Sequence, residues 1–227
     1  MSITSNNKLD DIAATYNEKY LQANHFNYKT WVYRPFVKAL IKMAKLKKDS
    51  RVLDAGCGQG FFTSLFADYG LSVKGVDISA EGICQAREHY GSDGAKFEVG
   101  DICNLPYEDM FDCVYSRSCS LYNRNNFDQD RSISDALLKY VKPGGTLVFD
   151  YYSNLCARKK SASWIYHSVS SVRQHFSPYP GAKVYFSLRI DTALLGSAAF
   201  YLTNLNMLTS RITGIGGDLI AIVQKSK

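Results

Sequence analysis

The amino-acid sequence predicts an α/β fold: a doubly wound, mostly parallel seven-stranded sheet with helices on both faces. From residue 51 onward, short apolar segments alternate with longer amphipathic ones, which is the pattern of strands joined by crossover helices. The short segments are continuously apolar rather than alternating, as strands are when a sheet is covered on both sides. An N-terminal helical lid and an insertion between the last two strands complete the expected fold.

The expected elements follow in order along the chain. Residues 8–48 predict two helical segments rich in aromatic residues. Strands are expected at 51–56, 72–79, 95–101, 111–116 and 146–153, and helices between them at 61–70, 79–91 and 127–141. The remaining pattern predicts a helix over 163–176, edge strands at 182–191 and 218–225, and the inserted segment 192–217 between these two strands.

The composition is that of an ordinary globular protein, with 46% hydrophobic and 21% charged residues. No segment approaches the roughly 20 consecutive apolar residues that a membrane-spanning helix needs. The first residues lack a basic region followed by an apolar run, so we expect no secretory signal and a cytoplasmic location. The six cysteines form no C-x-x-C pair and no cluster with histidine at metal-binding spacing, so no metal site is expected.

Part of the net charge of +6 lies in residues 34–51, which raises the question of a nucleic-acid partner. The spacing favours another interpretation. Apolar side chains recur at helical intervals, while basic side chains occupy a separate stripe: Val32, Phe36, Leu40 and Met43 against Arg34, Lys38, Lys42 and Lys45. We therefore expect an amphipathic helix with a solvated basic face, and nucleic acid is not the favoured partner.

The sharpest motif is VLDAGCGQG at residues 52–60. A strand ends there in a glycine-rich turn that opens a helix, which presents backbone N–H groups and a helix N-terminus to a ligand. Glycine is needed because a Cβ atom would keep the backbone away from that ligand. The turn alone is not specific, since several nucleotide-binding folds share it.

Three further features accompany this turn. Asp77 closes the second strand, where a carboxylate can accept hydrogen bonds from both hydroxyls of a ribose. Asp101 follows the third strand in a Gly-Asp-Ile sequence. Residues 138–148 predict the end of a helix, a Pro-Gly-Gly turn and the fifth strand.

Taken in this order over residues 50–153, these features resemble the class I S-adenosylmethionine-dependent methyltransferases. The resemblance implies S-adenosyl-L-methionine as the cofactor and S-adenosyl-L-homocysteine as its product. It also implies a single methyltransferase domain over 1–227. The parts of that domain would be a helical lid at 1–49, a cofactor-binding core at 50–153, and substrate-side elements with the closing strands at 154–227.

Carried over by position, the resemblance assigns the methionine part of the cofactor to Gly56, Cys57 and Gly58. Asp54 would orient this loop or bind the cofactor's ammonium group through water. Ser116, at the end of the fourth strand, would face the same part of the cofactor.

The resemblance assigns the ribose and adenine of the cofactor to Asp77, Asp101 and the residue after each. Asp77 and Ile78 would hold the ribose and the edge of the adenine, and Asp101 and Ile102 would hold the adenine itself. In many family members a helix before the first strand folds over the cofactor. Tyr16 resembles the tyrosines of such lids, and so does Tyr20; packing in the core is an equally good account of both.

Two sequence features make alternative functions less favoured. A nicotinamide dehydrogenase would more often carry G-x-G-x-x-G, whereas this loop is G-x-G-x-G after an acid. The Asp-Pro-Pro-Tyr-type motif of amino-group DNA and RNA methyltransferases is absent, because residues 116–123 read SRSCSLYN. Family members with this layout often act on small metabolites or glycan sugars, so we expect a small-molecule or glycan acceptor methylated on oxygen or nitrogen.

Methyl transfer from a sulfonium mainly requires an aligned acceptor and the exclusion of water. A hydroxyl or ammonium acceptor must also lose a proton, which a positioned side chain can take. Tyr122 and His167 are the leading candidates for this role, and Asp150, Tyr151 and His175 are further ones. Each has a structural alternative: Tyr122 as a cap that positions the substrate, and the histidines as core or surface residues.

Segment 192–217 is apolar enough for a substrate wall, a homodimer surface or a lipid-facing patch, and the sequence does not choose among them. Three other functions stay open. These are an RNA or protein methyltransferase that uses the basic N-terminal helix, a non-catalytic protein that keeps the fold to bind a partner, and a nicotinamide oxidoreductase. Salt-dependent RNA binding would favour the first of these functions. Absence of methyl transfer would favour the second, and binding of NAD would favour the third.

Overall fold

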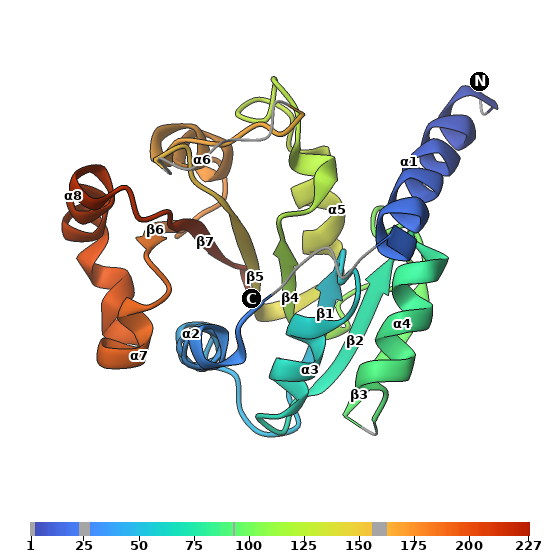
Figure 1. Cartoon of the computed structure of the whole chain (residues 1–227), viewed down its shortest axis with the longest axis horizontal. Coiled ribbons are helices and arrows are strands. Elements are labelled where there is room, and N and C mark those ends of the chain that lie inside the picture. The colour runs from blue at the N-terminus through green and yellow to red at the C-terminus, as the bar shows by residue number, and fades with distance from the viewer. Residues whose placement is uncertain (1–2, 23–27, 93, 156–162) are drawn as a thin grey trace.

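The computed structural model describes residues 3–22, 28–92, 94–155 and 163–227, with side chains from residue 10 onward. Seven strands form one sheet in the order β3-β2-β1-β4-β5-β7-β6 (Figure 1). Their bounds are β1 (Arg51–Ala55), β2 (Ser72–Asp77), β3 (Ala95–Val99), β4 (Phe111–Arg117), β5 (Val141–Tyr152), β6 (Lys183–Ser187) and β7 (Asp218–Gln224).

The central strands pair in parallel, from β3 through to β5. Strand β7 pairs antiparallel with both β5 and β6, which places it between them at one side of the sheet. The predicted fold class, a mostly parallel seven-stranded sheet with an insertion between its last two strands, is confirmed.

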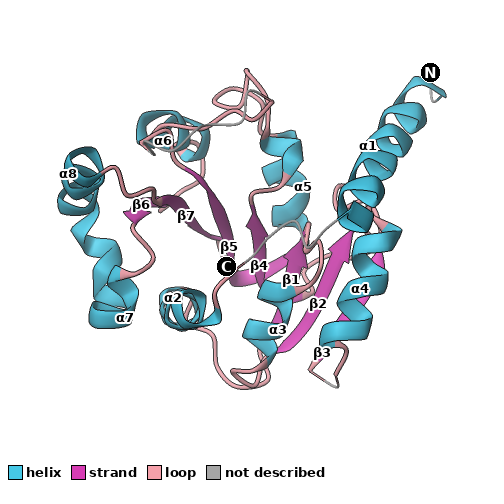
Figure 2. Cartoon of the chain, viewed as in Figure 1, coloured by secondary structure: helices cyan, strands magenta, loops and turns pink. Residues whose placement is uncertain are grey.

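Helices cover both faces of the sheet, as Figure 2 shows. The helices α2 and α3 pack with the segment η2 on one face, where Phe36, Phe66 and Phe200 are buried together. On the other face α5 and α6 bury Leu137 and Phe176 against the sheet. The α-helices are α1 (Ile3–Gln22), α2 (Thr30–Met43), α3 (Phe61–Ala67), α4 (Ala80–Tyr90), α5 (Ser132–Tyr140), α6 (Val169–Phe176), α7 (Asp191–Leu195) and α8 (Thr203–Thr213). Two segments, η1 (Ser120–Tyr122) and η2 (Gly196–Leu202), are 3₁₀-helical.

Some element boundaries differ from the expectation. The helix expected over 163–176 begins only at Val169, because Ser168 caps it and the chain before it forms a bridge between Ser153 and His167. The helix expected over 127–141 begins at Ser132. Strand β5 includes the Pro-Gly-Gly segment as an irregularity, since its register against β4 shifts between Phe111 and Cys113.

The basic helix has the expected two faces. Phe36 and Leu40 of α2 are buried, while Lys38 and Lys42 are exposed. Helix α2 therefore packs on the sheet, while residues of α1, together with Tyr28 and Thr30, line the cavity described below. None of the helices in the described ranges is long and apolar enough to cross a membrane.

The glycine that opens α3 gives a test of how tightly this part of the sheet packs. Gly60 has φ +83°, and a Cβ atom there would lie 2.7 Å from the Phe97 ring and 2.9 Å from Cβ of Ala86. Gly181 also has positive φ, at +72°, but nothing lies within 4 Å of its Cβ position. Alanine at either position lowers the free energy of unfolding by about 1–2 kcal/mol, because a Cβ atom is unfavourable in the left-handed backbone conformation. Only Gly60→Ala adds overpacking of about 1–3 kcal/mol.

We therefore expect Gly60→Ala to lower the free energy of unfolding by about 1–3 kcal/mol more than Gly181→Ala does. Urea unfolding of both variants beside the wild type measures this difference. Equal losses in the two variants would contradict the packing described for Gly60.

Candidate functional site

A cavity of about 500 Å³ lies at the carboxyl ends of the parallel strands. Its walls come from the segments that follow β1, β2, β3 and β4, and from α1, which lies across them (Figure 1). In a doubly wound sheet this is the edge at which ligands bind. The lining residues are Ile12, Tyr16, Tyr20, Leu21, Tyr28, Thr30, Asp54, Gly56, Cys57, Gly58, Gln59, Phe61, Phe62, Asp77, Ile78, Gln85, His89, Tyr90, Gly100, Asp101, Ile102, Arg117, Ser118, Cys119, Ser120 and Leu121.

The glycine-rich turn after β1 forms the floor of this cavity. The N–H of Gly56 donates to the carbonyl of Val76 at 2.8 Å, which ties the turn to β2. Gly58 has φ +53°, and a Cβ atom there would lie 2.6 Å from the hydroxyl oxygen of Tyr20. Only glycine leaves room for the lid tyrosine so close to the turn.

Asp77 joins the turn to the start of α4. One carboxylate oxygen accepts the N–H of Gly58 and the other accepts the N–H of Ser79, each at 2.9 Å. Burial raises the pKa of Asp77, and the backbone donors act in the opposite direction. Each carboxylate oxygen has a further lone pair, so Asp77 can fix the loop and still accept hydrogen bonds from a ligand in the cavity.

The segment after β3 supplies a second carboxylate and an apolar wall. Asp101 accepts the N–H of Cys103 at 3.0 Å and the side-chain amide of Asn104 at 2.5 Å. Ile102, nearly buried, and Ile78 line the same cavity. Two branched apolar side chains with a carboxylate beside them suit a flat heterocycle that carries an amino group.

Asp54 lies under the glycine turn and is buried. Its carboxylate accepts the hydroxyl of Thr63 at 2.6 Å. Burial raises the pKa of Asp54 to about 7, although the Thr63 hydrogen bond favours the ionised form. The turn therefore rests on a carboxyl group that changes its charge near neutral pH.

This pKa predicts a pH-dependent stability. An unfolded aspartate ionises near pH 3.9, so the folded chain holds a proton at Asp54 that the unfolded chain has released. The stability contributed by this protonated group is present below about pH 4 and is lost as the pH rises to about 7. Asp54→Asn carries no such group, so its stability relative to the wild type should rise between these pH values and then stay level. Urea unfolding from pH 4 to 8 measures this, and a constant difference would contradict it.

The lid helix α1 is held on α4 by side-chain hydrogen bonds. The side-chain oxygen of Asn17 accepts from the hydroxyl of Ser79 at 2.7 Å, and the amide of Gln85 donates to the carbonyl of Tyr20 at 3.0 Å. The Tyr16 and Tyr20 rings lie 5.9 Å apart, and both residues line the cavity. Burial raises the pKa of Tyr16, so its hydroxyl is a donor at neutral pH.

Arg117, the last residue of β4, brings a buried cation to the cavity. The guanidinium of Arg117 pairs with Asp150 and, at 2.9 Å, with Asp218. Aromatic rings surround it, with Phe62 at 4.9 Å and Tyr33 at 5.3 Å from the guanidinium carbon. This cluster holds one end of the cavity in place.

Ser118 adjoins Arg117 and has a strained backbone. Its φ of +45° lies in the left-handed region, and its N–H donates to the carbonyl of Asp150 at 2.8 Å. Among the described residues its buried hydroxyl has no hydrogen-bond partner, and neither do Nε and Nη2 of Arg117. Polar groups left open beside a cavity are available to a ligand.

Most of the residues expected to bind a cofactor meet in this cavity: Tyr16, Asp54, Gly56, Cys57, Gly58, Asp77, Ile78, Asp101 and Ile102. Ser116 does not. It is buried, and its hydroxyl donates to the carbonyl of Ala55 at 3.0 Å instead of facing the cavity.

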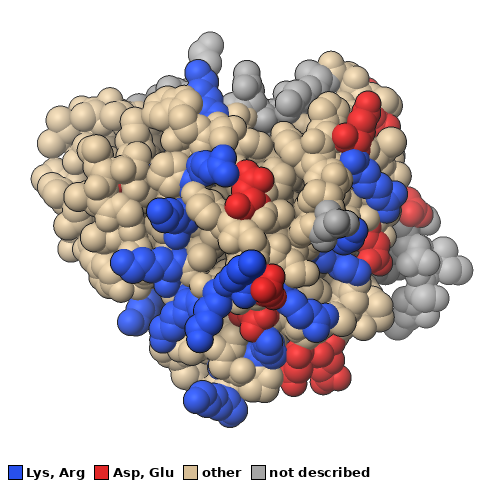
Figure 3. Space-filling view, turned by 90° about the horizontal axis from the view of Figure 1, so that it is seen from below, with Lys and Arg blue, Asp and Glu red and all other residues tan. Residues whose placement is uncertain are grey.

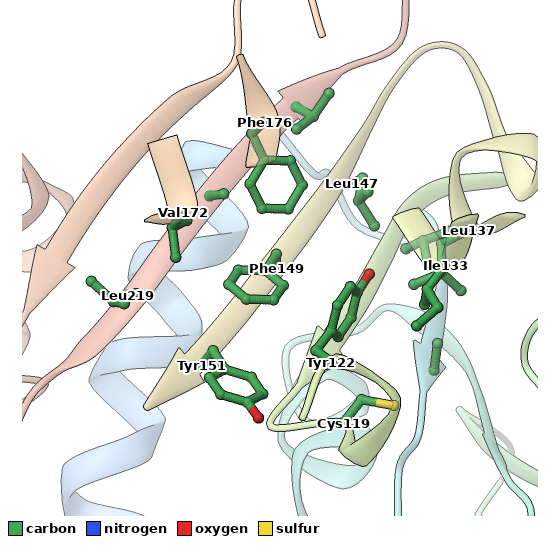
Figure 4. Packing of buried hydrophobic residues seen from close by; sticks show 14 of the residues in the cluster. Cys119, Tyr122, Ile133, Leu137, Leu147, Phe149, Tyr151, Val172, Phe176 and Leu219 are labelled. Atoms are coloured by element: carbon green, nitrogen blue, oxygen red, sulfur yellow. The ribbon is translucent and has the colours of Figure 1, made fainter. Parts of the chain in front are cut away.

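The two leading candidates for a proton acceptor also lie elsewhere. Tyr122 is buried among Phe149 and the residues of α5, as Figure 4 shows, and its hydroxyl contacts that of Ser134 at 3.1 Å. His167 stacks on Phe127 at 3.9 Å and contacts the Tyr122 carbonyl through Nε2 at 3.0 Å. Neither lines the cavity, so the structure does not support a proton-accepting role for either of them.

The further candidates are held in the interior too. His175 lies in α6, with Nε2 2.8 Å from the Ser134 hydroxyl. Asp150 is completely buried, and its Oδ2 accepts from Arg117 and from the hydroxyl of Tyr115 at 2.7 Å. Tyr151 is buried and stacks on Trp164 at 5.7 Å.

The residues that shape the cavity through distant contacts were not identified from the sequence. Asn17 and Gln85 hold α1 on α4, and Arg117 and Ser118 form the wall at the end of β4. A signal for Arg117 was present, because an arginine in an apolar strand needs a buried partner.

Comparison with known proteins agrees with this geometry. A family described as methyltransferase domains matches residues 46–185. The malonyl-(acyl-carrier protein) O-methyltransferase of Erwinia billingiae is 28% identical over 159 residues, which cover 69% of this chain and 61% of that protein. The ubiquinone biosynthesis O-methyltransferase of Erwinia tasmaniensis is 30% identical over 115 residues, covering 51% and 45%. This chain therefore matches less than two thirds of the length of either relative.

Among solved structures, the chain resembles phosphoethanolamine N-methyltransferase 2 of Haemonchus contortus in complex with S-adenosyl-L-methionine. The TM-score is 0.60 at 18% identity, and the match covers 87% of this chain and 56% of that one. At this identity the likeness concerns the fold.

Proposed function

Because the chain belongs to the class I S-adenosylmethionine-dependent methyltransferases, we propose that it methylates a small molecule, sugars included, on oxygen or nitrogen. The observation that carries this proposal is the meeting of the glycine turn, Asp77 and Asp101 in one cavity under α1. The name of the ubiquinone biosynthesis O-methyltransferase reported above supports a small acceptor.

The residues present fit the cofactor. Asp77 has lone pairs left for two ribose hydroxyls after it has bound Gly58 and Ser79. Ile78 and Ile102 offer apolar contacts for adenine, and Asp101 offers an acceptor for its amino group. The glycine turn would hold the methionine part above Asp54.

When bound, the cofactor supplies a methyl group that its positively charged sulfur already activates. The chain's own residues then have to orient the acceptor and exclude water. Tyr16 and Tyr20 of the lid cover the cavity, and the close contact of Tyr20 with Gly58 closes it on that side. A hydroxyl or ammonium acceptor also releases a proton when the methyl group is transferred to it.

The acceptor would enter at the end formed by Tyr28, Phe61, Phe62, Arg117 and Ser118. Three of them contact one another, with the Arg117 guanidinium carbon 5.7 Å from the Tyr28 ring and 4.9 Å from the Phe62 ring. Aromatic walls suit a flat or apolar acceptor, and the open donors of Arg117 and Ser118 suit a polar oxygen on it.

Transfer of labelled methyl groups tests the proposal. The protein is incubated with methyl-labelled S-adenosylmethionine and with either the ultrafiltered small-molecule fraction or the macromolecular fraction of a cell extract. We expect label to enter the small-molecule fraction, S-adenosylhomocysteine to accumulate, and Asp77→Ala to abolish both. Label in the macromolecular fraction alone, or in neither fraction, would contradict the proposal.

A further inference from the structure

The insertion between β6 and β7 exposes an apolar surface that we call the apolar ridge. It consists of Leu194, Leu195, Tyr201, Leu205, Leu208 and Ile212 from α7, η2 and α8. Leu205, Leu208 and Ile212 follow a helical repeat and share one face of α8. Leu194 is 88% exposed and Ile212 is 75% exposed, so these side chains are not packed against the rest of the described chain.

The apolar ridge is almost free of charge. Segment 190–215 contains only two charged residues, Asp191 and Arg211. Asp191 is occupied internally, because its carboxylate accepts the side-chain amide of Asn206 at 2.6 Å and the hydroxyl of Ser187 at 3.2 Å. A ridge of this kind in water indicates an interaction surface.

A stripe of basic residues runs along α2, which packs against α7 and η2 of the ridge. Lys38, Lys42 and Lys45 are exposed along it, and Arg34 belongs to it as well. Trp31 lies on the same helical face and is 63% exposed. Figure 3 shows Lys and Arg gathered on this side of the molecule, next to a region on the left with few charged residues, where Figure 1 places α7 and α8.

We propose that the apolar ridge and the basic stripe together bind the surface of an anionic lipid membrane. Leucine, isoleucine and tyrosine side chains can enter the boundary between headgroups and acyl chains, and an exposed tryptophan suits the same depth. Lysines beside them attract anionic headgroups. The apolar ridge therefore matches the acyl-chain region of a leaflet, and the basic stripe matches its anionic headgroups.

The charge distribution favours a lipid surface over a second copy of the chain. A twofold contact through the ridge would bring the basic stripes of both copies toward one interface. Segment 190–215 offers no open carboxylate to compensate them, because Asp191 is already bound. Anionic headgroups supply that compensation.

The surface also adjoins the site. Tyr28, just before the Lys29 cap of α2, and Thr30, the first residue of α2, line the cavity, and Trp31 follows them. A membrane bound to this face would lie near the end of the cavity assigned above to the acceptor. Membrane binding itself does not depend on the proposed methyl transfer, so the two can fail separately.

Flotation of the full chain with lipid vesicles tests the proposal. Vesicles of phosphatidylcholine alone are compared with vesicles that also contain phosphatidylglycerol. We expect binding to the anionic vesicles that falls as salt rises, and at least tenfold weaker binding to the neutral ones.

Two sets of variants separate the contributions. Leu208→Ser with Ile212→Ser should weaken binding by at least tenfold, whereas Asn204→Ser with Thr213→Ser on the same helix should not. Lys38→Gln with Lys42→Gln should weaken it by about fivefold per lysine, whereas Lys96→Gln with Lys139→Gln, which removes the same charge elsewhere, should not.

Absence of vesicle binding at low salt would overturn the proposal, and so would binding that the ridge and stripe variants leave unchanged. If sedimentation instead shows a dimer that Leu208→Ser with Ile212→Ser dissociates, and vesicles are not bound, the ridge is an interface between copies and the proposal fails.

Discussion

Arg117→Met is expected to lower the free energy of unfolding by about 3–5 kcal/mol. The guanidinium pairs with Asp150 and Asp218, whose side chains are completely buried. Arg189 remains on Asp218 at 3.2 Å in the variant, but Asp150 loses its only cation among the described residues. An uncompensated buried carboxylate accounts for the size of this loss.

The surface pair of Arg34 and Asp68 is the matched control. These side chains lie 3.2 Å apart but are about half exposed, so Arg34→Met should cost no more than about 1 kcal/mol. Urea unfolding of both variants gives the comparison, and Asp150→Asn added to Arg117→Met should recover part of the loss. Similar losses at Arg34 and Arg117 would contradict the role of burial.

Asp77→Ala is expected to weaken the binding of S-adenosylhomocysteine by about 100-fold or more. The carboxylate holds the N–H groups of Gly58 and Ser79, and hydrogen bonds to a charged group contribute about 1.5–3 kcal/mol each. Without it the glycine turn loses its link to α4, and the ribose hydroxyls lose their acceptor.

Titration calorimetry measures this change, with Asp68→Ala as a control that removes a carboxylate outside the cavity. Thermal unfolding of the ligand-free variant separates a loss of affinity from a loss of folded protein. Unchanged affinity of a folded Asp77→Ala variant would remove Asp77 from the ribose site.

The sequence alone predicted the site residues whose positions depend on where each strand ends. Asp77 is the last residue of β2, Gly58 and Asp101 come shortly after β1 and β3, and parallel strands bring their carboxyl ends to one edge of the sheet. Once the strands are assigned, these residues must converge on the same cavity.

Residues whose environment is set by distant packing could not be predicted in the same way. Tyr122 is only one residue from the cavity wall at Leu121, but Ser134 of α5 and Phe149 of β5 enclose its ring in the core. His167 precedes the Ser168 cap of α6, and its ring is held in the interior by stacking on Phe127 and by the Tyr122 carbonyl. Ser116 and Arg117 are adjacent, yet only Arg117 reaches the cavity.

Titration of S-adenosylhomocysteine into the wild-type protein tests the central claim most directly. The account predicts saturable binding at one site per chain, a higher melting temperature with the ligand, and no such effect of NAD. Absence of binding at saturating S-adenosylhomocysteine, or binding of NAD in its place, would contradict the assignment of this cavity to the methyl-donating cofactor.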